Sequence, residues 1–503
     1  MKKNKKVIIV GTGIGGLTAG LRLIKKGYDV EFLEKYFQAG GRANQIKKDG
    51  FVFDTGPSFF SMSYVFKDFA KDCGINLPFS YEELDPLFSV NFDNKKVFNL
   101  YKDIKKLSKQ FENIEENFEQ KFIDYLKKSE DTFNETFNTV IQKNYNTLLD
   151  YILTLTKVNS RYLPYIFRSF YDEIKRNFSS EEARITFSLI SFFLGKPPFD
   201  TMAVYTLLSY VEFKNDGYYF VKGGMYKVIE GLVKELQKDN VIFNYNTEIV
   251  DFVKEGNKIK FLVDQKGKKW SADIFLINSD AAYFRGKVFK KKKYSNENLN
   301  KMDWTTGYLT IYLGVKGNFD NLYYHNYYLG YNFKDYSQKI TKDKNLPQIP
   351  YYYVNVLSKK SKECAPPGHE ALFFVCPVPN LIYKSDWSDK DLIVSDILDD
   401  FSKKIGRDIK KDIVLKIVWT PEDWQNNFNL YKGSGLGLSH NFNQIGYFRP
   451  KNFDEDYKNV FYVGCSTLPG AGIPMVAISS KLAVERIEEY VSSLSYKNSR
   501  ENR

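Results

Sequence analysis

The sequence has few of the residues that build metal sites, disulfide frameworks and hydrolytic triads. It contains 503 residues, of which four are cysteine and three are histidine. No two cysteines form a C-x-x-C pair, so neither zinc spacing nor a secreted disulfide framework is indicated and reduced thiols are expected. The histidines are widely spaced and no G-x-S-x-G motif accompanies them, which argues against a metal centre and a Ser-His-Asp triad. We expect no bound metal.

Arginine is also scarce. The net charge is +12, but arginine supplies only 12 of the 73 basic residues and lysine supplies the rest. Arginine is the residue suited to bidentate recognition of phosphates and bases, so its scarcity argues against sequence-specific binding of nucleic acid. A lysine-rich surface suits anionic lipid headgroups. Codon bias combined with solubility is the alternative explanation of the same composition.

No run of eighteen apolar residues occurs, and the longest candidate, around Phe187–Leu194, is too short to span a bilayer. Lysines near the N-terminus followed by an apolar run imitate a signal peptide. That run is rich in glycine and has no cleavage site, so the interpretation as a signal peptide fails. We expect a cytoplasmic protein that is soluble or attached peripherally to the cell membrane.

Apolar and aromatic residues, by contrast, are plentiful. They make up 43 % and 17 % of the chain, respectively, which is typical of a folded protein with a large core. A chain of this length is long enough for two or three domains.

The first fifty residues contain the clearest motif. A short apolar strand at 7–10 leads into Gly11, Gly13 and Gly16, which form G-x-G-x-x-G at the start of a predicted helix. The first glycine permits a tight turn, the second lets a pyrophosphate approach the backbone, and the third lets the helix pack closely on the strand. A second strand, at 29–33, ends at Glu34, which lies 18 residues past Gly16, where a carboxylate accepts hydrogen bonds from ribose. This context predicts a dinucleotide site in a Rossmann-like α/β domain.

Gly40, Gly41 and Arg42 follow this unit. The glycines permit backbone to lie beside a phosphate, and Arg42 is expected to supply a charge-assisted contact to it. A surface loop is the alternative explanation of this triplet.

Strand and helix patterns return at several later points in the chain. The runs at 217–244 and 272–281 indicate strands that rejoin the nucleotide domain, which is therefore expected to be discontinuous. Charged helical segments occupy about 66–210, between the N-terminal unit and these runs. Strand signals dominate 304–450. The expected organisation is a nucleotide domain from 1–70, 216–285 and 455–490, a helical substrate region at 71–215, a mixed-sheet substrate domain at 286–454, and a disordered tail at 491–503.

Three segments admit two interpretations each. Ile185, Leu189, Phe192 and Phe193 follow helical spacing and form either an ordinary core stripe or one wall of an apolar substrate cavity. The aromatic and aliphatic segment at 149–171 forms either a buried helix pair or a membrane-surface element. Lys290–Lys293 is either a solvated loop or a membrane-facing patch.

The last informative block is VFYVGCSTLPGAGIPMVAISSK at 460–481. A strand leads into Gly464, and a proline- and glycine-rich turn ends in Gly472, Ile473 and Pro474 before a helix. Tight turns before a helix suit close approach to a cofactor, so these four residues are predicted to contact it.

Several motifs, taken together, resemble a known family. The G-x-G-x-x-G, Glu34 and G-G-R run is similar to the N-terminus of the FAD-dependent amine-oxidase-like superfamily. The chain further resembles bacterial carotenoid desaturases of the phytoene and 4,4'-diapophytoene desaturase type. The matching segments are NQIKKDGFVFDTGP at 44–57, KGGMY at 222–226, APPG at 365–368, TPED at 420–423, GSGLGLSH at 433–440, FRP at 448–450 and the GCSTLPGAGIP block.

This resemblance implies a monoamine-oxidase-like fold that binds FAD without a covalent bond and acts at a membrane surface. It also implies a long, linear polyene substrate whose saturated C–C bonds are dehydrogenated in succession. The electron acceptor, oxygen or a quinone, is not indicated. Because a hydrocarbon offers no group for a metal or nucleophile, the chemistry is expected to lie mainly in the cofactor.

Leu468 departs from the family pattern, which often has histidine at this place in the closing block. The departure removes a polar group near the flavin and leaves oxidation, ketolation or isomerisation of a carotenoid open as alternative outcomes. A flavin-free binding module like the GDP-dissociation inhibitors is a third interpretation. No catalytic residue is identified, although Glu212 and Asp200 are candidates for accepting a proton.

Overall fold

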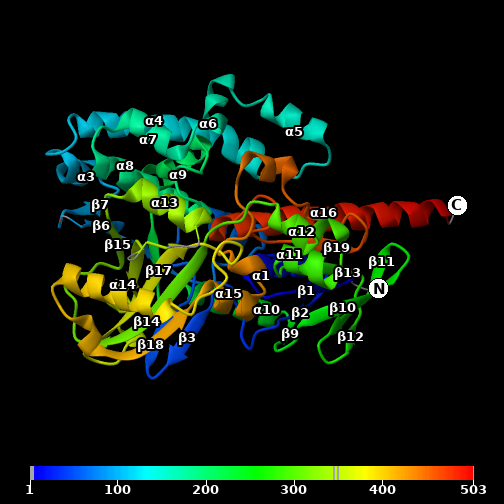
Figure 1. The fold of residues 1–503 in the computed structure, drawn as a ribbon. Helices are drawn as coiled ribbons and strands as arrows, with labels where there is room; N and C mark the ends of the chain where they lie inside the picture. The colour runs from blue at the N-terminus through cyan, green and yellow to red at the C-terminus, as the bar shows by residue number, and fades with distance from the viewer. Residues whose placement is uncertain (1–4, 94, 344–345, 348–349, 502–503) are drawn as a thin grey trace.

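A five-stranded parallel sheet carries the G-x-G-x-x-G motif, called the fingerprint from here on. The computed structural model describes residues 5–93, 95–343, 346–347 and 350–501, and Figure 1 shows its two large sheets and the helices above them. Three distant parts of the chain supply the strands of this sheet, so Val7 pairs directly with Ile274. In sheet order the strands are β19 (Val460–Tyr462), β13 (Ile274–Ile277), β1 (Lys6–Val10), β2 (Asp29–Leu33) and β9 (Ile242–Asn244).

The central strand, β1, pairs with β13 on one side and β2 on the other, both in parallel. Its residues 7–10 are buried, as expected for a strand of a parallel sheet that is covered on both faces. The predicted strands at 7–10 and 29–33 are confirmed by β1 and β2. The carboxyl ends of β1, β13 and β19 therefore meet at one edge, where the ligand of such a sheet binds.

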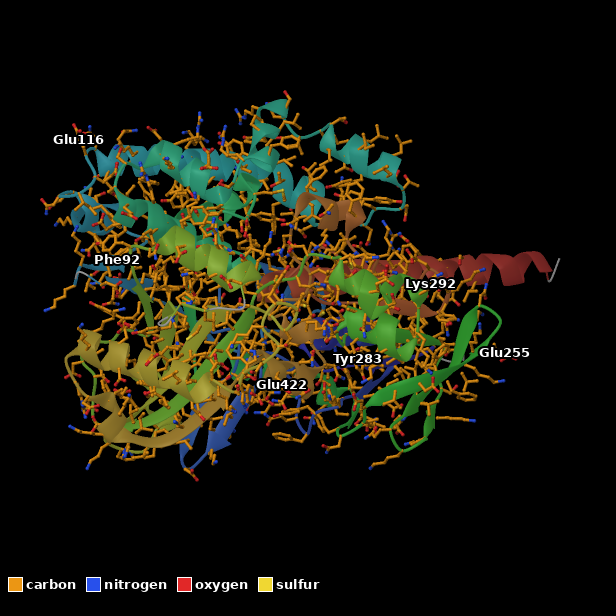
Figure 2. The ribbon with its side chains drawn as sticks, viewed as in Figure 1. Phe92, Glu116, Glu255, Tyr283, Lys292 and Glu422 are labelled. Carbon is orange, nitrogen blue, oxygen red and sulfur yellow. The ribbon has the colours of Figure 1, made fainter. Side chains whose placement is uncertain are left out.

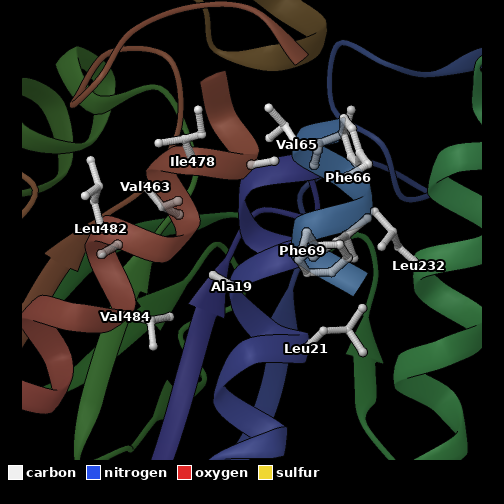
Figure 3. Packing of buried hydrophobic residues seen from close by; sticks show 14 of the residues in the cluster. Ala19, Leu21, Val65, Phe66, Phe69, Leu232, Val463, Ile478, Leu482 and Val484 are labelled. Atoms are coloured by element: carbon white, nitrogen blue, oxygen red, sulfur yellow. The ribbon is translucent and has the colours of Figure 1, made fainter. Parts of the chain in front are cut away.

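Four helices build the core over one face of this sheet (Figure 3). Helix α1 (Ile14–Lys25) packs against α16 (Ile473–Glu501) and α10 (Tyr226–Lys238), and α16 also contacts α2 (Ser63–Asp72). Figure 3 shows Leu21 and Phe69 near Leu232 on one side of α1, while Leu482 lies on the other side. Leu482 is fully buried, so truncation to alanine is expected to cost about 2–5 kcal/mol.

A seven-stranded mixed sheet forms the second layer. All neighbouring strands run antiparallel except β15 and β6, which are parallel. Helix α14 (Lys390–Ile405) covers one face through an aliphatic and aromatic cluster. In sheet order the strands are β18 (Ile413–Trp419), β14 (Gly307–Lys316), β17 (His369–Val378), β16 (Tyr352–Val356), β15 (His325–Leu329), β6 (Phe88–Phe92) and β7 (Val97–Leu100).

The region 71–215 differs from its predicted helical character at its start. Strands β6 and β7 extend the large sheet, and β5 (Tyr81–Glu83) pairs with β8 (Tyr219–Val221). These strands are too short to produce a convincing alternation in the sequence. The helices that follow are α3 (Ile104–Phe111), α4 (Phe118–Thr136), α5 (Leu148–Leu155), α6 (Pro164–Phe167), α7 (Phe170–Asn177), α8 (Glu181–Ser188) and α9 (Leu207–Tyr210).

Among the described residues, the remaining elements include two smaller sheets and four helices. The sheets are β3 (Gln45–Lys48) with β4 (Phe51–Asp54), and β10 (Ile249–Glu255), β11 (Lys258–Asp264) and β12 (Lys269–Trp270). The helices are α11 (Ala281–Tyr283), α12 (Asn296–Asn300), α13 (Phe333–Lys342) and α15 (Pro421–Phe428). Figure 2 shows charged side chains such as Glu116, Glu255 and Lys292 on the outside.

The C-terminal segment also differs from expectation. A disordered tail was predicted for 491–503, but α16 continues to Glu501, and residues 502–503 lie outside the described part. Tyr490 and Val491 pack on the core, which anchors the helix at the point where the tail was expected to begin. Within the described residues, no helix is both long and apolar enough to cross a membrane.

Candidate functional site

One large cavity, of about 680 Å³, connects the fingerprint turn to the space beneath the helical layer. At one end it is lined by Gly11, Gly13 and Glu34, from the parallel sheet. At the other end it is lined by aliphatic and aromatic side chains from the large sheet and from helices α5, α6 and α9. A polar cradle and an apolar hollow therefore share one continuous space.

Nine of the ten residues predicted to bind a cofactor line this cavity, and Gly16 packs behind it. Gly11 adopts φ +101°, which only glycine adopts without strain. A Cβ atom on Gly16 would lie 2.6 Å from the carbonyl oxygen of Gly11 and 2.7 Å from Oδ1 of Asn278. The third glycine is thus required for close packing, while the N-terminal amides of α1 remain free to bind an anion.

Glu34 is held rigidly at the end of β2. Its Oε2 accepts hydrogen bonds from the Thr12 amide at 2.8 Å and the Thr12 hydroxyl at 2.6 Å, and its Oε1 accepts from the Tyr36 amide at 2.8 Å. Burial raises the pKa of Glu34, and these hydrogen bonds oppose that shift. The carboxylate is therefore a fixed acceptor at the cavity wall, as binding of ribose hydroxyls requires.

Arg42 joins the N-terminal loop to the C-terminal motifs. It donates from Nη1 to the Gly435 carbonyl at 2.8 Å and from Nη2 to the Cys465 sulfur. The same side chain lines the cavity, and a Cβ atom on neighbouring Gly41 would approach Gly13 Cα at 3.6 Å. The loop and the fingerprint turn are thus in contact, whereas the phosphate contact of Arg42 stays a prediction.

His440 fits against the turn of the closing block. Its Nε2 accepts a hydrogen bond from the Ala471 amide at 3.1 Å, and a Cβ atom on Gly470 would lie 2.5 Å from the same nitrogen. Burial, with the nearby positive charge of Arg449, lowers the pKa of His440 to about 3, so the imidazole is neutral. Leu468 lines the cavity close by along the chain. The turn at 468–472 therefore has an imidazole beside it. This imidazole belongs to His440, whereas the family pattern often has a histidine at the position of Leu468.

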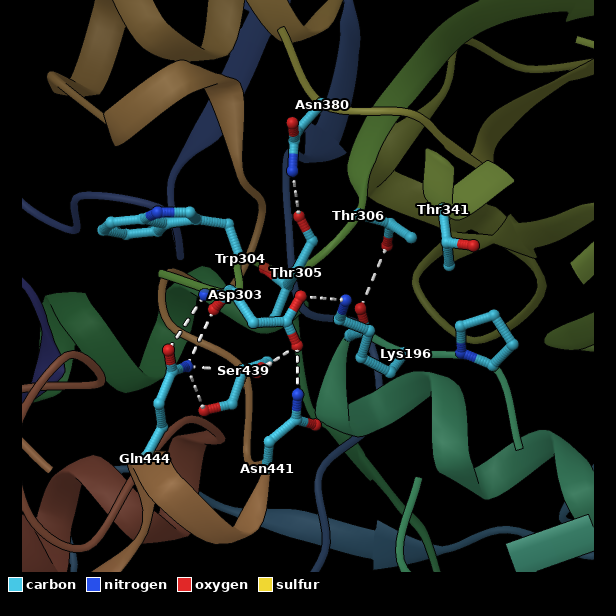
Figure 4. Close-up of polar contacts among 12 residues, drawn as sticks. Lys196, Asp303, Trp304, Thr305, Thr306, Thr341, Asn380, Ser439, Asn441 and Gln444 are labelled. Carbon is cyan, nitrogen blue, oxygen red and sulfur yellow. Dashed lines mark hydrogen bonds and ion pairs between the residues drawn. The ribbon is translucent and has the colours of Figure 1, made fainter. Parts of the chain in front are cut away.

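A partly buried polar network holds Ser439 and Asn441, the neighbours of His440 in the chain (Figure 4). The Asp303 carboxylate accepts hydrogen bonds from the Ser439 hydroxyl at 2.7 Å and from the side-chain amide of Asn441, and these two residues flank His440. It also forms an ion pair with Lys196 at 2.7 Å. Because residues on both sides of His440 are tied to one carboxylate, the imidazole has little freedom to leave the loop.

The apolar end of the cavity includes the stripe at 185–193. Helix α8 ends at Ser188 and a 3₁₀-helix, Leu189–Leu194, continues the chain. Leu189, Phe192 and Phe193 line the cavity, whereas Ile185 is buried in the core. The interpretation as a cavity wall is therefore correct for three of the four residues.

Of the two candidates for accepting a proton, only Glu212 lines the cavity. Asp200 is exposed and lies outside the lining. Among the described residues, no group of histidine, cysteine or acidic side chains has the arrangement of a metal site.

Comparison with known proteins decides the family. The sequence profile of the flavin-containing amine oxidoreductases matches residues 14–488. The chain belongs to this family. It is 31 % identical to the zeta-carotene-forming phytoene desaturase of Myxococcus xanthus, over 96 % of this chain and 94 % of that protein. It is 28 % identical to the 4,4'-diapophytoene desaturase (4,4'-diapolycopene-forming) of a Methylomonas species, over 97 % and 96 %.

The amine oxidoreductase fold is shared with putrescine oxidase bound to putrescine, with a TM-score of 0.63 at 12 % identity over 97 % of this chain and 99 % of that one. The predicted α/β, amine-oxidase-like fold and the predicted resemblance to carotenoid desaturases are confirmed. FAD is the cofactor of this amine oxidoreductase, and the flavin-free binding module is not supported.

Residues that sequence reasoning missed add unpaired polar atoms to the wall of the cavity. Oδ1 of Asn278 and the hydroxyls of Ser279 and Ser466 are buried with no hydrogen-bond partner in the described part of the chain, and all three residues line the cavity. Buried polar groups without partners are rare, so three along one cavity fit a polar ligand. The signal was present: Asn278 and Ser279 follow strand β13 directly, at the ligand-binding edge of a parallel sheet.

Proposed function

We propose that this protein dehydrogenates a long, linear C30 or C40 polyene, such as diapophytoene or phytoene, in carotenoid biosynthesis. The observation that carries the proposal is the single cavity that joins the FAD cradle to a hollow lined by Phe192, Phe193 and Tyr327. A hydrocarbon binds there by burial of apolar area, at about 25 cal/mol per Å². The relatives named as phytoene and diapophytoene desaturases support the same substrate class.

FAD, when bound, supplies a two-electron oxidant. The chain's own residues hold the polyene in the hollow, exclude water, and leave few polar groups near the saturated carbons. The lone pair of His440 Nε2 accepts a hydrogen bond from the Ala471 amide, and Arg42 donates to Gly435 and Cys465, so both groups are engaged within the protein. This arrangement suits removal of hydrogen without addition of oxygen. Oxygen or a quinone as the electron acceptor remains part of the proposal, and supplying each alone distinguishes them.

Pigment chromatography tests the proposal directly. The gene is expressed in hosts that make phytoene or diapophytoene, and products are separated by chromatography and read by absorbance. Desaturation gives a longer conjugated system without oxygen, whereas an oxygenated or merely isomerised product would overturn it in favour of the alternative outcomes. Gly16→Val is the matched control, because its side chain would clash with the Gly11 carbonyl and abolish FAD binding.

The proposal includes a membrane surface from which the polyene enters. Large apolar side chains are exposed on α5 and α6 and beside them: Leu148, Leu149, Ile152, Leu153, Leu163 and Phe167, the last 82 % exposed. Leu163 and Phe442 are both exposed and line the cavity, so this surface is continuous with the hollow. A contiguous apolar surface around a cavity mouth supports docking on lipid acyl chains.

The lysine run at 290–293 gives little support to membrane contact. Lys291 is nearly buried and pairs with Asp454 at 2.5 Å and Asp456 at 2.7 Å, and Lys293 pairs with Glu455 at 2.8 Å. These charges are compensated within the protein. We therefore assign the membrane contact to the apolar surface on α5 and α6 rather than to this run.

A further inference from the structure

Glu212 is a buried carboxyl group that the fold does not explain. It lies on a π-helical turn, Val211–Asn215, and is 5 % exposed. It lines the cavity together with Leu208, Val211 and Tyr218. Among the described residues it forms no ion pair, and π-helical turns are found frequently at functional sites.

The other carboxyl groups along the cavity have structural partners at the dinucleotide end. Glu34 is bound by Thr12 and Tyr36. Glu248 accepts hydrogen bonds from the Tyr283 hydroxyl at 2.9 Å and the Asn429 amide at 3.0 Å, and Asp280 accepts from the Tyr283 amide at 2.9 Å. Glu212 is thus the carboxyl group of the apolar hollow.

Among the described residues, the groups that face Glu212 are tyrosine hydroxyls, which leave Glu212 as the one side chain there that ionises near neutrality. They are Tyr218, which follows the π-helical turn, Tyr327 on β15 and Tyr125 on α4, and burial raises the pKa of each hydroxyl, so all three stay neutral. Burial raises the pKa of Glu212 to about 8, and the Tyr218 hydroxyl lowers it slightly. Burying a carboxyl group in an apolar cavity is costly, and such perturbed groups concentrate at active sites.

We propose that Glu212 accepts the proton that the polyene loses during dehydrogenation. The step rests on the proposed function. One C–H bond breaks and its electron pair leaves as a hydride to the oxidised cofactor. The C–H bond of the adjacent carbon breaks, its electron pair forms the new C=C bond, and its proton goes to a carboxylate oxygen of Glu212. The polyene is oxidised by two electrons and the cofactor is reduced by two.

The reaction therefore requires the ionised form of Glu212. With a pKa of about 8, roughly one-tenth of the enzyme is active at pH 7, and the rate of flavin reduction rises about tenfold per pH unit below that pKa. Above it the rate levels off. The Tyr218 hydroxyl opposes the rise in the pKa of Glu212 that burial causes, which makes Tyr218 a positioning residue.

The test measures anaerobic flavin bleaching in a single turnover with phytoene or diapophytoene in liposomes, from about pH 6 to pH 10. Glu212→Gln is expected to slow bleaching by about 10²- to 10⁴-fold and to remove the pH dependence, with the oxidised flavin spectrum unchanged. Tyr218→Phe is expected to move the rise to higher pH. Asp200→Asn, at the exposed carboxyl, is the matched control and keeps the wild-type rate and profile.

A readout that needs no turnover accompanies it. Infrared difference spectra across the same pH range are expected to contain a protonated-carboxyl C=O band that Glu212→Gln lacks. An unchanged rate and pH profile in Glu212→Gln would overturn the role of Glu212. If Glu212→Gln does not retain flavin, the wild-type profile decides. A wild-type bleaching rate that does not change with pH overturns the role of Glu212, and a profile that Tyr218→Phe shifts to higher pH supports this role. Failure of either polyene to bleach the wild-type flavin would instead refute the proposed function.

Discussion

The ring nitrogen Nε2 of His440 accepts a hydrogen bond from the backbone amide of Ala471, 31 residues along the chain, with 3.1 Å between the two nitrogens. This hydrogen bond ties the GSGLGLSH segment to the proline- and glycine-rich turn that lines the cavity. Since Gly470 leaves no room for a Cβ atom beside the ring, the two segments form one surface. The shape of this part of the cavity wall depends on that contact.

Replacing His440 with leucine tests this dependence. The variant leaves the Ala471 amide buried without an acceptor, which is expected to cost about 1–3 kcal/mol in the free energy of unfolding and to weaken FAD binding. Urea unfolding and flavin fluorescence titration measure the two effects. His369→Leu, at a partly exposed histidine on β17, is the control and is expected to change stability by less than about 0.5 kcal/mol. Equal stability and equal FAD affinity of the two variants would contradict this role of His440.

The same histidine predicts acid sensitivity. The folded-state pKa of His440 is about 3, below that of an unfolded histidine, so between these values the unfolded state binds more protons. Stability conferred by the neutral ring is full above about pH 6.5 and is lost as the pH falls, by about 1.4 kcal/mol per pH unit. His325, whose pKa burial also lowers, contributes in the same direction.

Urea midpoints of wild type and His440→Leu at decreasing pH measure this loss. The destabilisation caused by His440→Leu is expected to shrink by about 1.4 kcal/mol for each pH unit below 6.5, because the variant lacks the group that must stay unprotonated. A difference between the two proteins that is independent of pH would show that His440 is not a buried neutral ring.

The sequence alone predicts the dinucleotide fingerprint and its strands, because those features depend on local glycine spacing and apolar runs, and the family resemblance adds FAD. Gly16 and Glu34 occupy the positions that such patterns require. The contacts of His440 and Asn278 were not predicted, since they join segments far apart in the chain and have no local signature. Strand β6 was missed because it and its neighbour β7 are short, and its other partner, β15, lies more than 200 residues away.

Arg449 is expected to be among the most sensitive residues for folding. It is 1 % exposed, and its guanidinium donates to carbonyl oxygens in two motifs, including Ser439 at 3.1 Å and Thr467 at 3.0 Å. Arg449→Met leaves several buried carbonyls unpaired and is expected to destabilise the protein by about 3 kcal/mol or more. Urea unfolding measures this loss. Arg161→Met, at an exposed arginine, is the control, and a similar small effect at both positions would refute the structural role.

The apolar surface on α5 and α6 is expected to bind membranes. Leu149 and Phe167 are 63 % and 82 % exposed, and Figure 1 shows both helices on the side of the molecule opposite β9. Burying a large apolar side chain in lipid contributes about 1.5–3 kcal/mol, so the double variant Leu149→Ser and Phe167→Ser is expected to weaken binding to liposomes by at least tenfold. Co-sedimentation with vesicles measures it, with flavin content as a check on folding.

Ile242→Ser provides the matched control for this surface. Ile242 lies on β9 and is 60 % exposed, so it loses a comparable apolar side chain from a face distant from the cavity mouth. Its binding to vesicles is expected to equal that of wild type. If both variants bind equally well, lipid contacts another face, and the route of the polyene into the cavity must begin elsewhere. If only the double variant fails, and its flavin is still reduced by polyene dissolved in detergent, the surface serves docking rather than chemistry.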